Sequence, residues 1–512
     1  SEIGELETLL FSVGLSLAFL LLAGLFMNEL CLLFSALKPL SPVNLAIILN
    51  PLVFISVILD CLRRRETKIL GIKKIALSPM TLVFLFPIVL SVVGAMWVNA
   101  FENNVFLLLM FIVISILFVV TVSSQKLIPP KFYSLFVFVM AISLLYHYSL
   151  ISRYIYMGDV HIEYFVFKTT QNDARWYSTN PYSPNTYYGT MYSMLSVTIL
   201  PTIYSNLLNM DPAWTFKIVF PLIFSFVPLG LYQMWKKYFG KKSAFISAFL
   251  FMAYETFYTE MLGLNRQMVA ELFFVLILLV FFSDEMKTYK KTICFAIFSF
   301  GLITSHYGLS VIFLFFISLS FISLILVRHA RKNVTLSMVV LFFVMMFAWY
   351  IFTSEGAVLE DILLFGNHVS NQLNDFFNFQ SRGKLVLRGL GLESPPTIWN
   401  AVSRVFAYIT EGLIVVGFVG LIRKRVELSF KKEYFIFTML AWIFLAALII
   451  VPGLANTMRM TRFYHVLLFF LAPLCVVGAR ILAELAFKHR KELATSILLL
   501  SCLLYTSPSP RD

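Results

Sequence analysis

Long apolar runs separated by short polar connections fill most of this chain. The runs lie near 9–28, 46–62, 78–98, 105–123, 133–151, 214–235, 243–258, 267–283, 292–305, 308–327, 335–353, 405–422, 434–452 and 463–483. A helix needs roughly 20 apolar residues to cross the hydrocarbon core of a bilayer. The pattern therefore predicts an all-α fold, a polytopic transmembrane helical bundle of about fourteen spans.

Composition supports a membrane protein and argues against a nucleic-acid binder. Hydrophobic residues make up 60% of the 512 residues, charged residues 13%, and the mean hydropathy is +0.85. A soluble domain has roughly 25% charged residues. The net charge of +13 comes from Lys and Arg clusters between the apolar runs, which indicate membrane topology. We expect no nucleic-acid partner.

The basic clusters also predict how the chain is oriented. They occur in alternate connections, which we assign to the cytoplasm. The two long connections, 152–212 and 354–404, then fall on the extracytoplasmic side of a plasma membrane. Connections longer than about 12–15 residues are usually functional or disordered. Within the first, Met191–Leu208 is apolar enough for a helix at the membrane interface, broken at Pro201.

The same pattern predicts the organisation of the chain. The expected parts are N-terminal transmembrane helices (1–132), a core (133–353) that contains the connection 152–212, the second connection (354–404) and C-terminal transmembrane helices (405–501). The chain begins at Ser1, so we expect a missing N-terminal segment. The tail 502–512 resembles a translated sequencing adapter and is excluded from fold reasoning.

The segment Gly158–Tyr164 is the first candidate for chemistry. Asp159 and Glu163 share a face if the segment is helical, whereas an extended segment would align His161 with both. Converging carboxylates can bind a divalent cation such as Mg or Mn, or accept a proton from a hydroxyl. The alternative is an ordinary solvated start of a loop.

Three further groups of polar residues lie at the predicted outer ends of spans. Glu260 and Arg266, with Glu271 about one turn deeper, could serve a site or form a structural ion pair. His306 lies in a tight turn, where a structural histidine is the common alternative. Three basic residues at spacings of three offer phosphate recognition, with lipid snorkelling as the alternative: Arg459, Arg462 and His465.

Several stretches together resemble an uncharacterised archaeal family of multi-spanning membrane proteins that is grouped with the GT-C glycosyltransferase superfamily. The resemblance is carried by Gly4–Leu17, Gly158–Tyr164, Asn265–Phe274, Ser305–Gly308 and Arg462–His465. It implies transfer of a sugar from a polyprenyl-phosphate-linked donor to a glycan, lipid or protein acceptor on the extracytoplasmic face. In that family an acidic residue of the first outer loop lies at the acceptor, and Asp159 matches its place.

The resemblance implies roles for the candidate residues. Asp159 and Glu163 would be catalytic, and the metal ligands would come from Asp159, His161, Glu163 and Glu260. Trp176 would stack on a sugar ring. The other residues expected to bind substrate are Arg266, His306, Arg459, Arg462 and His465. The alternative function is a transporter or flippase for a lipid-linked glycan, which should carry ionisable residues near the centres of its spans.

Overall fold

The computed structural model describes residues 4–34, 38–62, 78–155, 158–179, 187–328, 333–395, 397–423 and 432–486. Within this part of the chain all regular secondary structure is helical and no strand occurs, which confirms the predicted fold class. The basic connection 63–77 and the tail 502–512 lie outside the described residues.

The helices follow one another in four groups. The first group contains α1 (Glu5–Leu33), α2 (Pro42–Leu62), α4 (Pro79–Phe101), α5 (Val105–Ser123) and α6 (Tyr133–Ser149). The first long connection forms α7 (Val160–Asp173), α8 (Tyr187–Tyr192) and α9 (Ile199–Leu208). The central group contains α10 (Pro212–Trp214), η2 (Thr215–Val219), α11 (Phe220–Phe224), α12 (Phe226–Ala253), α13 (Glu255–Tyr258), η3 (Glu260–Gly263), α14 (Asn265–Phe282), α15 (Thr288–Ile303), α16 (Tyr307–Leu326) and α17 (Leu336–Phe352). The last group contains α18 (Ala357–Gln372), α19 (Lys384–Gly389), α20 (Ile398–Ile422), α21 (Lys432–Ile450), α22 (Leu454–Thr457) and α23 (Met460–Ala486).

The helices account for every apolar run in the sequence, but not every run forms a separate long helix. Eleven helical segments of the described chain are long and apolar enough to cross a membrane, or twelve if the bent pair α17–α18 is counted as one. The run 214–235 and most of the run 243–258 belong to one stretch, Pro212–Ala253. That stretch turns at Gly240, whose φ of 78° and ψ of 166° favour glycine.

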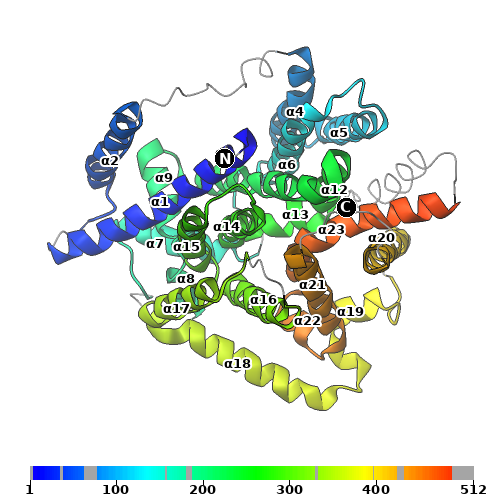
Figure 1. Ribbon diagram of the computed structural model, residues 1–512. Helices are drawn as coiled ribbons and strands as arrows, with labels where there is room; N and C mark the ends of the chain where they lie inside the picture. Colours follow the sequence, from blue (N-terminus) through cyan, green and yellow to red (C-terminus); the bar gives the residue numbers. More distant parts are fainter. Residues whose placement is uncertain are drawn as a thin grey trace.

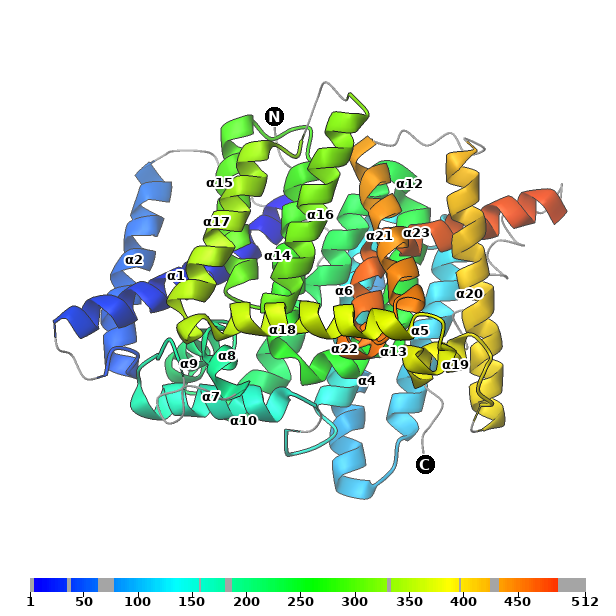
Figure 2. The same ribbon diagram turned by 90° about the horizontal axis from the view of Figure 1, so that it is seen from below.

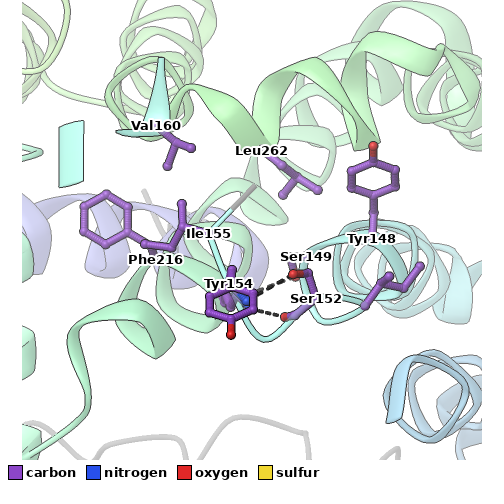
Figure 3. A pocket seen from close by; sticks show the side chains of 10 residues that line it. Tyr148, Ser149, Ser152, Tyr154, Ile155, Val160, Phe216 and Leu262 are labelled. Atoms are coloured by element: carbon purple, nitrogen blue, oxygen red, sulfur yellow. Dashed lines mark hydrogen bonds between the residues drawn. The ribbon is translucent and has the colours of Figure 1, made fainter. Parts of the chain in front are cut away.

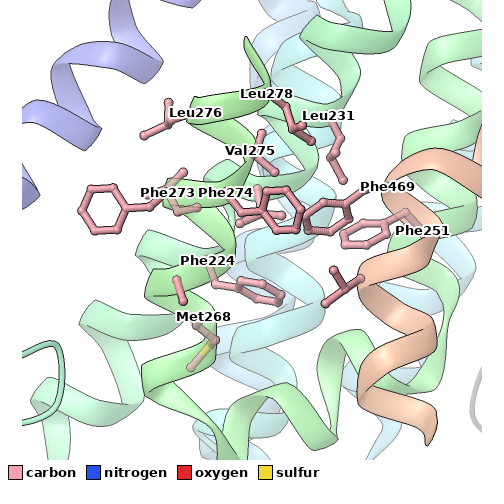
Figure 4. Close-up of a cluster of buried hydrophobic side chains, with 14 of the residues drawn as sticks. Phe224, Leu231, Phe251, Met268, Phe273, Phe274, Val275, Leu276, Leu278 and Phe469 are labelled. Atoms are coloured by element: carbon pink, nitrogen blue, oxygen red, sulfur yellow. The ribbon is translucent and has the colours of Figure 1, made fainter. Parts of the chain in front are cut away.

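The centre of the bundle is α14, around which the other helices are arranged (Figure 1). Beyond its first turn its sequence is apolar on every side except at Glu271, and all of its residues are buried. A helix that is apolar all round is stable only when neighbours or lipid cover every face. The neighbours here include α12 and α23, whose aromatic side chains meet those of α14 in one packed cluster (Figure 4).

The first long connection is folded onto the bundle. Leu195 N–H donates to the Thr304 carbonyl at 2.8 Å, and Ser196 Oγ donates to the Ser305 carbonyl at 3.2 Å. The predicted interfacial helix does not break at Pro201, because the break lies before α9 begins. Pro201 occupies the first turn of α9, where a backbone N–H has no partner within the helix, so proline is tolerated there.

The second long connection is mostly helical and runs across the bundle. It bends by 110° from α17 into α18. Its later part packs on the loop before α22, where Gly453 N–H donates to the Ser381 carbonyl at 3.1 Å. In Figure 2, α7, α10 and α19 lie toward the end of the bundle that is away from the N-terminus, and α18 crosses the middle of the view. The two long connections meet where α18 packs on α8.

Candidate functional site

The helix α7 places the two predicted carboxylates on one face. Gly158 has φ of +48°, and Asp159 follows as the N-cap residue. The Asp159 carbonyl accepts hydrogen bonds from Ile162 N–H at 3.0 Å and Glu163 N–H at 3.1 Å. The segment is therefore helical and not extended. Gly158 also packs closely on Gly263, because a β-carbon there would lie 3.8 Å from the Gly263 carbonyl oxygen.

Glu163 caps the N-terminus of the central helix α14 from another element. Its Oε2 accepts hydrogen bonds from Asn265 N–H at 2.9 Å and Asn265 Nδ2 at 3.0 Å. Leu264, the N-cap residue of α14, has no side-chain acceptor of its own. Because the first amides of a helix lack partners within it and carry partial positive charge, a carboxylate there is stabilised. Glu163 thereby attaches α7 to the buried end of α14.

Arg266 bridges the two carboxylates. Its Nη1 lies 2.8 Å from Glu163 Oε1, and its Nη2 lies 2.8 Å from Asp159 Oδ2. Arg266 is 4% exposed and Glu163 is fully buried, whereas the Asp159 side chain is 25% exposed. The planar guanidinium, with donors fixed in a fork, suits this double contact. Asp159 is consequently the carboxylate of the pair that a substrate can reach.

A second arginine reaches Asp159 from α23. Arg462 Nη1 lies 3.3 Å from Asp159 Oδ2, and Arg462 Nε lies 3.9 Å from Glu260 Oε2. Thr461 Oγ1 donates to the same Glu260 oxygen at 2.8 Å. Segments far apart in sequence thus meet in what we call the ionic cluster: Asp159, Glu163, Glu260, Arg266 and Arg462.

The surroundings of the two α7 carboxyls shift their pKa values in opposite directions. Burial raises the pKa of Glu163, and Arg266 and Asn265 only partly offset this effect. Burial also acts to raise the pKa of Asp159, but Arg266 and Arg462 outweigh it and hold that pKa below its ordinary value. Paired carboxyls with divergent pKa values are common in acid–base sites. Asp159 is the one that stays ionised most readily.

His306 lies at the turn between α15 and α16, close to the arginines. Its Nδ1 accepts a hydrogen bond from Leu309 N–H at 3.1 Å, so it is the N-cap of α16. Burial lowers the pKa of His306 well below its ordinary value, and the charges of Arg266 and Arg462 add to this effect. A neutral imidazole with Nδ1 as acceptor carries its proton on Nε2. His306 is therefore an uncharged donor beside the ionic cluster.

A buried polar contact lies one turn deeper. Gln267 Nε2 donates to Glu271 Oε1 at 2.9 Å, and Glu271 Oε2 lies 3.4 Å from His465 Nε2. Both Glu271 and His465 are fully buried. The His465 ring lies against Phe251, with a centroid separation of 4.4 Å. His465 thus links α23 to α14 and does not reach the surface that Asp159 and Arg462 share.

An apolar cavity of about 180 Å³ adjoins the cluster (Figure 3). Val160, the neighbour of Asp159, and Leu262 of η3 contribute to its wall. The other lining residues come from the end of α6, the segment that follows it, and η2: Tyr148, Ser149, Ile151, Ser152, Tyr154, Ile155, Phe216 and Lys217.

Besides His306 and His465, two more predicted substrate ligands lie outside the ionic cluster. Trp176 is 2% exposed, and its Nε1 donates to the Tyr192 carbonyl at 2.8 Å, so it has no free face for a sugar. Arg459 is exposed and precedes α23 with φ of 56°. Because Arg459 is not helical, only Arg462 and His465 share the stripe that the spacing predicts. Trp176 instead anchors the first connection to Asn28 of α1.

The four predicted metal ligands are not arranged as a cation site. His161 is exposed while Glu163 is buried, since residues two apart on a helix point in different directions. The Arg266 guanidinium already places positive charge between the carboxylates of Asp159 and Glu163. In the described part of the chain, no group of three or more His, Cys, Asp and Glu side chains is suited to hold a metal ion.

Two polar residues of this region are not among the predicted site residues. Thr461 orients Glu260, and Lys217 lies in the cavity wall. Thr461 directly precedes Arg462, and this position beside a predicted substrate ligand was the signal in the sequence. Lys217 lies just inside an apolar run, where charged residues are rare, and this rarity was the signal in the sequence.

The helices and their burial define the class of this chain as a polytopic helical membrane protein. Residues 291–503 are similar to a family described as "Predicted membrane protein (DUF2206)". The matched region contains His306, Arg462 and His465, whereas Asp159, Glu163 and Arg266 lie before it. No curated protein matches the chain.

Proposed function

We propose that this protein is a membrane-embedded glycosyltransferase, which moves a sugar from a polyprenyl-phosphate-linked donor to an acceptor on the extracytoplasmic face. The observation that carries the proposal is the partly exposed pair of Asp159 and Arg462. Their side chains are 25% and 22% exposed, and Asp159 belongs to the first long connection. A carboxylate that could accept a proton and a guanidinium that could bind phosphate thus lie side by side, next to the cavity.

Arg462 would bind the phosphate of the donor. In the transfer, the bond between the sugar C1 and the phosphate oxygen breaks, and its electrons remain on the phosphate. Guanidinium groups bind phosphate through paired hydrogen bonds, and a fixed cation stabilises the charge that develops on the leaving group. Arg266 is 4% exposed and contacts both α7 carboxylates, so its role is to position Asp159.

Asp159 would accept the proton of the acceptor hydroxyl as its oxygen bonds to C1. With two guanidiniums beside it, its lowered pKa makes it a weak base. A donor phosphate would draw Arg462 away from Asp159, and the pKa of Asp159 would then rise. The carboxylate would thus become an effective base only when donor is bound. Glu163, predicted as catalytic, is fully buried and is a positioning residue in this mechanism.

The experiment is transfer of a labelled sugar from a polyprenyl-phosphate donor in membranes that contain the full chain. Asp159→Asn should lower the rate by roughly 10²–10⁴-fold, the usual contribution of general-base catalysis. Arg462→Ala should raise the donor concentration needed for half-maximal rate. Asp173→Asn, at the other end of α7, is the matched control and should transfer normally. Transfer should also continue in EDTA, since the mechanism uses no divalent cation.

Full activity of Asp159→Asn would refute the proposed mechanism. The second candidate is a transporter of lipid-linked glycan, which the buried contact of Glu271 with His465 favours, because ionisable groups inside a bundle often line ion or substrate paths. Vesicles containing the wild-type chain would then move a fluorescent lipid-linked glycan between leaflets, and neither wild type nor Asp159→Asn would transfer sugar.

A further inference from the structure

Lys217 is a buried cation in an irregular segment. It belongs to the π-helix η2, and it is 6% exposed. π-Helical turns are rare and often occur at functional sites. Side chains of α6 hold this turn in place, since Ser149 Oγ donates to the Lys217 carbonyl at 3.0 Å and Tyr146 Oη donates to the Ile218 carbonyl at 3.3 Å.

The partners of the Lys217 ammonium are neutral groups. Its Nζ donates to the Ser152 carbonyl and lies 5.4 Å from the centroid of the Trp214 ring. Among the residues that the structure describes, no carboxylate forms an ion pair with Lys217. Asp211, six residues earlier, uses Oδ1 to accept the Ala213 N–H at 2.9 Å. A buried cation without a counter-charge is costly, so an anion at this position would be stabilising.

The cavity beside Lys217 is lined by both polar and apolar side chains. Ser149 and Ser152 line it together with Lys217, and its apolar lining includes Ile155, Val160, Phe216 and Leu262. Figure 3 shows the apolar side chains gathered around the space and the serine hydroxyls at its edge. A volume of about 180 Å³ suits a small head group and a few carbon atoms.

We propose that this cavity binds the phosphate group of a net-anionic amphiphile, with Lys217 as the counter-charge and the apolar wall against the first carbons of the tail. Lysine binds phosphate as a point charge, and a fixed cation attracts an anionic lipid head group. Free phosphate has the same anionic chemistry and is the other source of the ligand. The binding is independent of the proposed glycosyl transfer, because the ionic cluster takes no part in it.

The test is native mass spectrometry of the full chain released from micelles that contain phosphatidylglycerol or phosphatidylcholine. Wild type should retain phosphatidylglycerol and not the zwitterionic lipid. Lys217→Gln should weaken this retention by roughly 10- to 100-fold, the value of a hydrogen bond to a charged group. Lys217→Arg should keep it. Lys168→Gln, on the outer helix α7, is the matched control and should bind like wild type.

Equal retention of phosphatidylglycerol by wild type and Lys217→Gln would overturn the proposal, as would equal retention of the two lipids by wild type. Ile155→Trp fills the cavity and leaves Lys217 in place, so this variant should also lose the lipid. It provides an independent test if Lys217→Gln does not fold. Displacement of the lipid by inorganic phosphate from wild type would support the same site and show that the head group alone suffices. Because the readout is binding, a failure of sugar transfer does not affect it.

Discussion

Replacement of Glu163 tests whether a buried carboxylate holds the site together. Glu163→Gln keeps the size of the side chain and one oxygen that can accept the Asn265 N–H. It removes the negative charge 2.8 Å from Arg266 Nη1. Arg266 would then have Asp159 as its remaining anionic partner, at 2.8 Å.

The expected cost follows from burial. Removing one partner of a buried ion pair costs about 3–5 kcal/mol, because the other charge remains unpaired. Here Asp159 still compensates Arg266, so the cost should be closer to that of a hydrogen bond to a charged group, about 1.5–3 kcal/mol. Glu163→Ala should cost about 1 kcal/mol more, because α14 also loses its cap.

The assay is unfolding of the purified chain by SDS titration in mixed micelles, followed by circular dichroism. Glu484→Gln is the matched control, because Glu484 forms a surface pair with Arg480 four residues earlier, with side chains 38% and 61% exposed. Such pairs contribute about 0.3–0.5 kcal/mol. If Glu163→Gln changes the unfolding free energy no more than Glu484→Gln does, Glu163 does not compensate Arg266 and the structural account of the cluster is wrong.

Three further predictions concern the protonation of His306, the contact between α14 and α23, and the orientation of the chain in the membrane. His306 has a lowered folded-state pKa, so stability should fall as the pH drops below the ordinary histidine value of about 6.5, by at most about 1.4 kcal/mol per pH unit. His306→Asn can still cap α16 and should lose that part of the pH dependence; an unchanged pH profile would contradict this. Glu271→Gln should lower the free energy of unfolding, because it removes the carboxylate that lies 3.4 Å from His465 Nε2 between α14 and α23; an unfolding free energy equal to that of wild type would contradict this. In a cysteine-free background, His161→Cys should be labelled from outside intact cells and Lys241→Cys should not, and the reverse result would refute the orientation.

Much of the architecture could be predicted from the sequence. The apolar runs predict an all-α bundle because the energetic demand of the bilayer is local: each backbone polar group in lipid needs a partner within its own helix. The spacing of Asp159 and Glu163 predicts a shared helical face, and α7 confirms it. The alternation of basic clusters also predicts that the two long connections lie on one side of the membrane.

Predictions from the spacing of residues were wrong where the backbone conformation changes within a few residues. Arg459, Arg462 and His465 have helical spacing, but α23 begins at Met460, and Arg459 lies outside it with positive φ. Trp176 looked available because it lies in a long polar connection. In the folded chain it is buried, because Asn28 and Tyr192 bind its polar groups.

Only the tertiary structure decided which charges meet. Asp159 contacts Arg266 and Arg462, which lie 107 and 303 residues further along the chain. Hydropathy indicates which segments cross the bilayer, but it does not distinguish one apolar neighbour from another. Helices in lipid associate through shape and a few polar contacts, which depend on both partners. The same holds for Lys217: that it is a lysine is visible in the sequence, whereas its burial among neutral partners is a property of the packed helices around it.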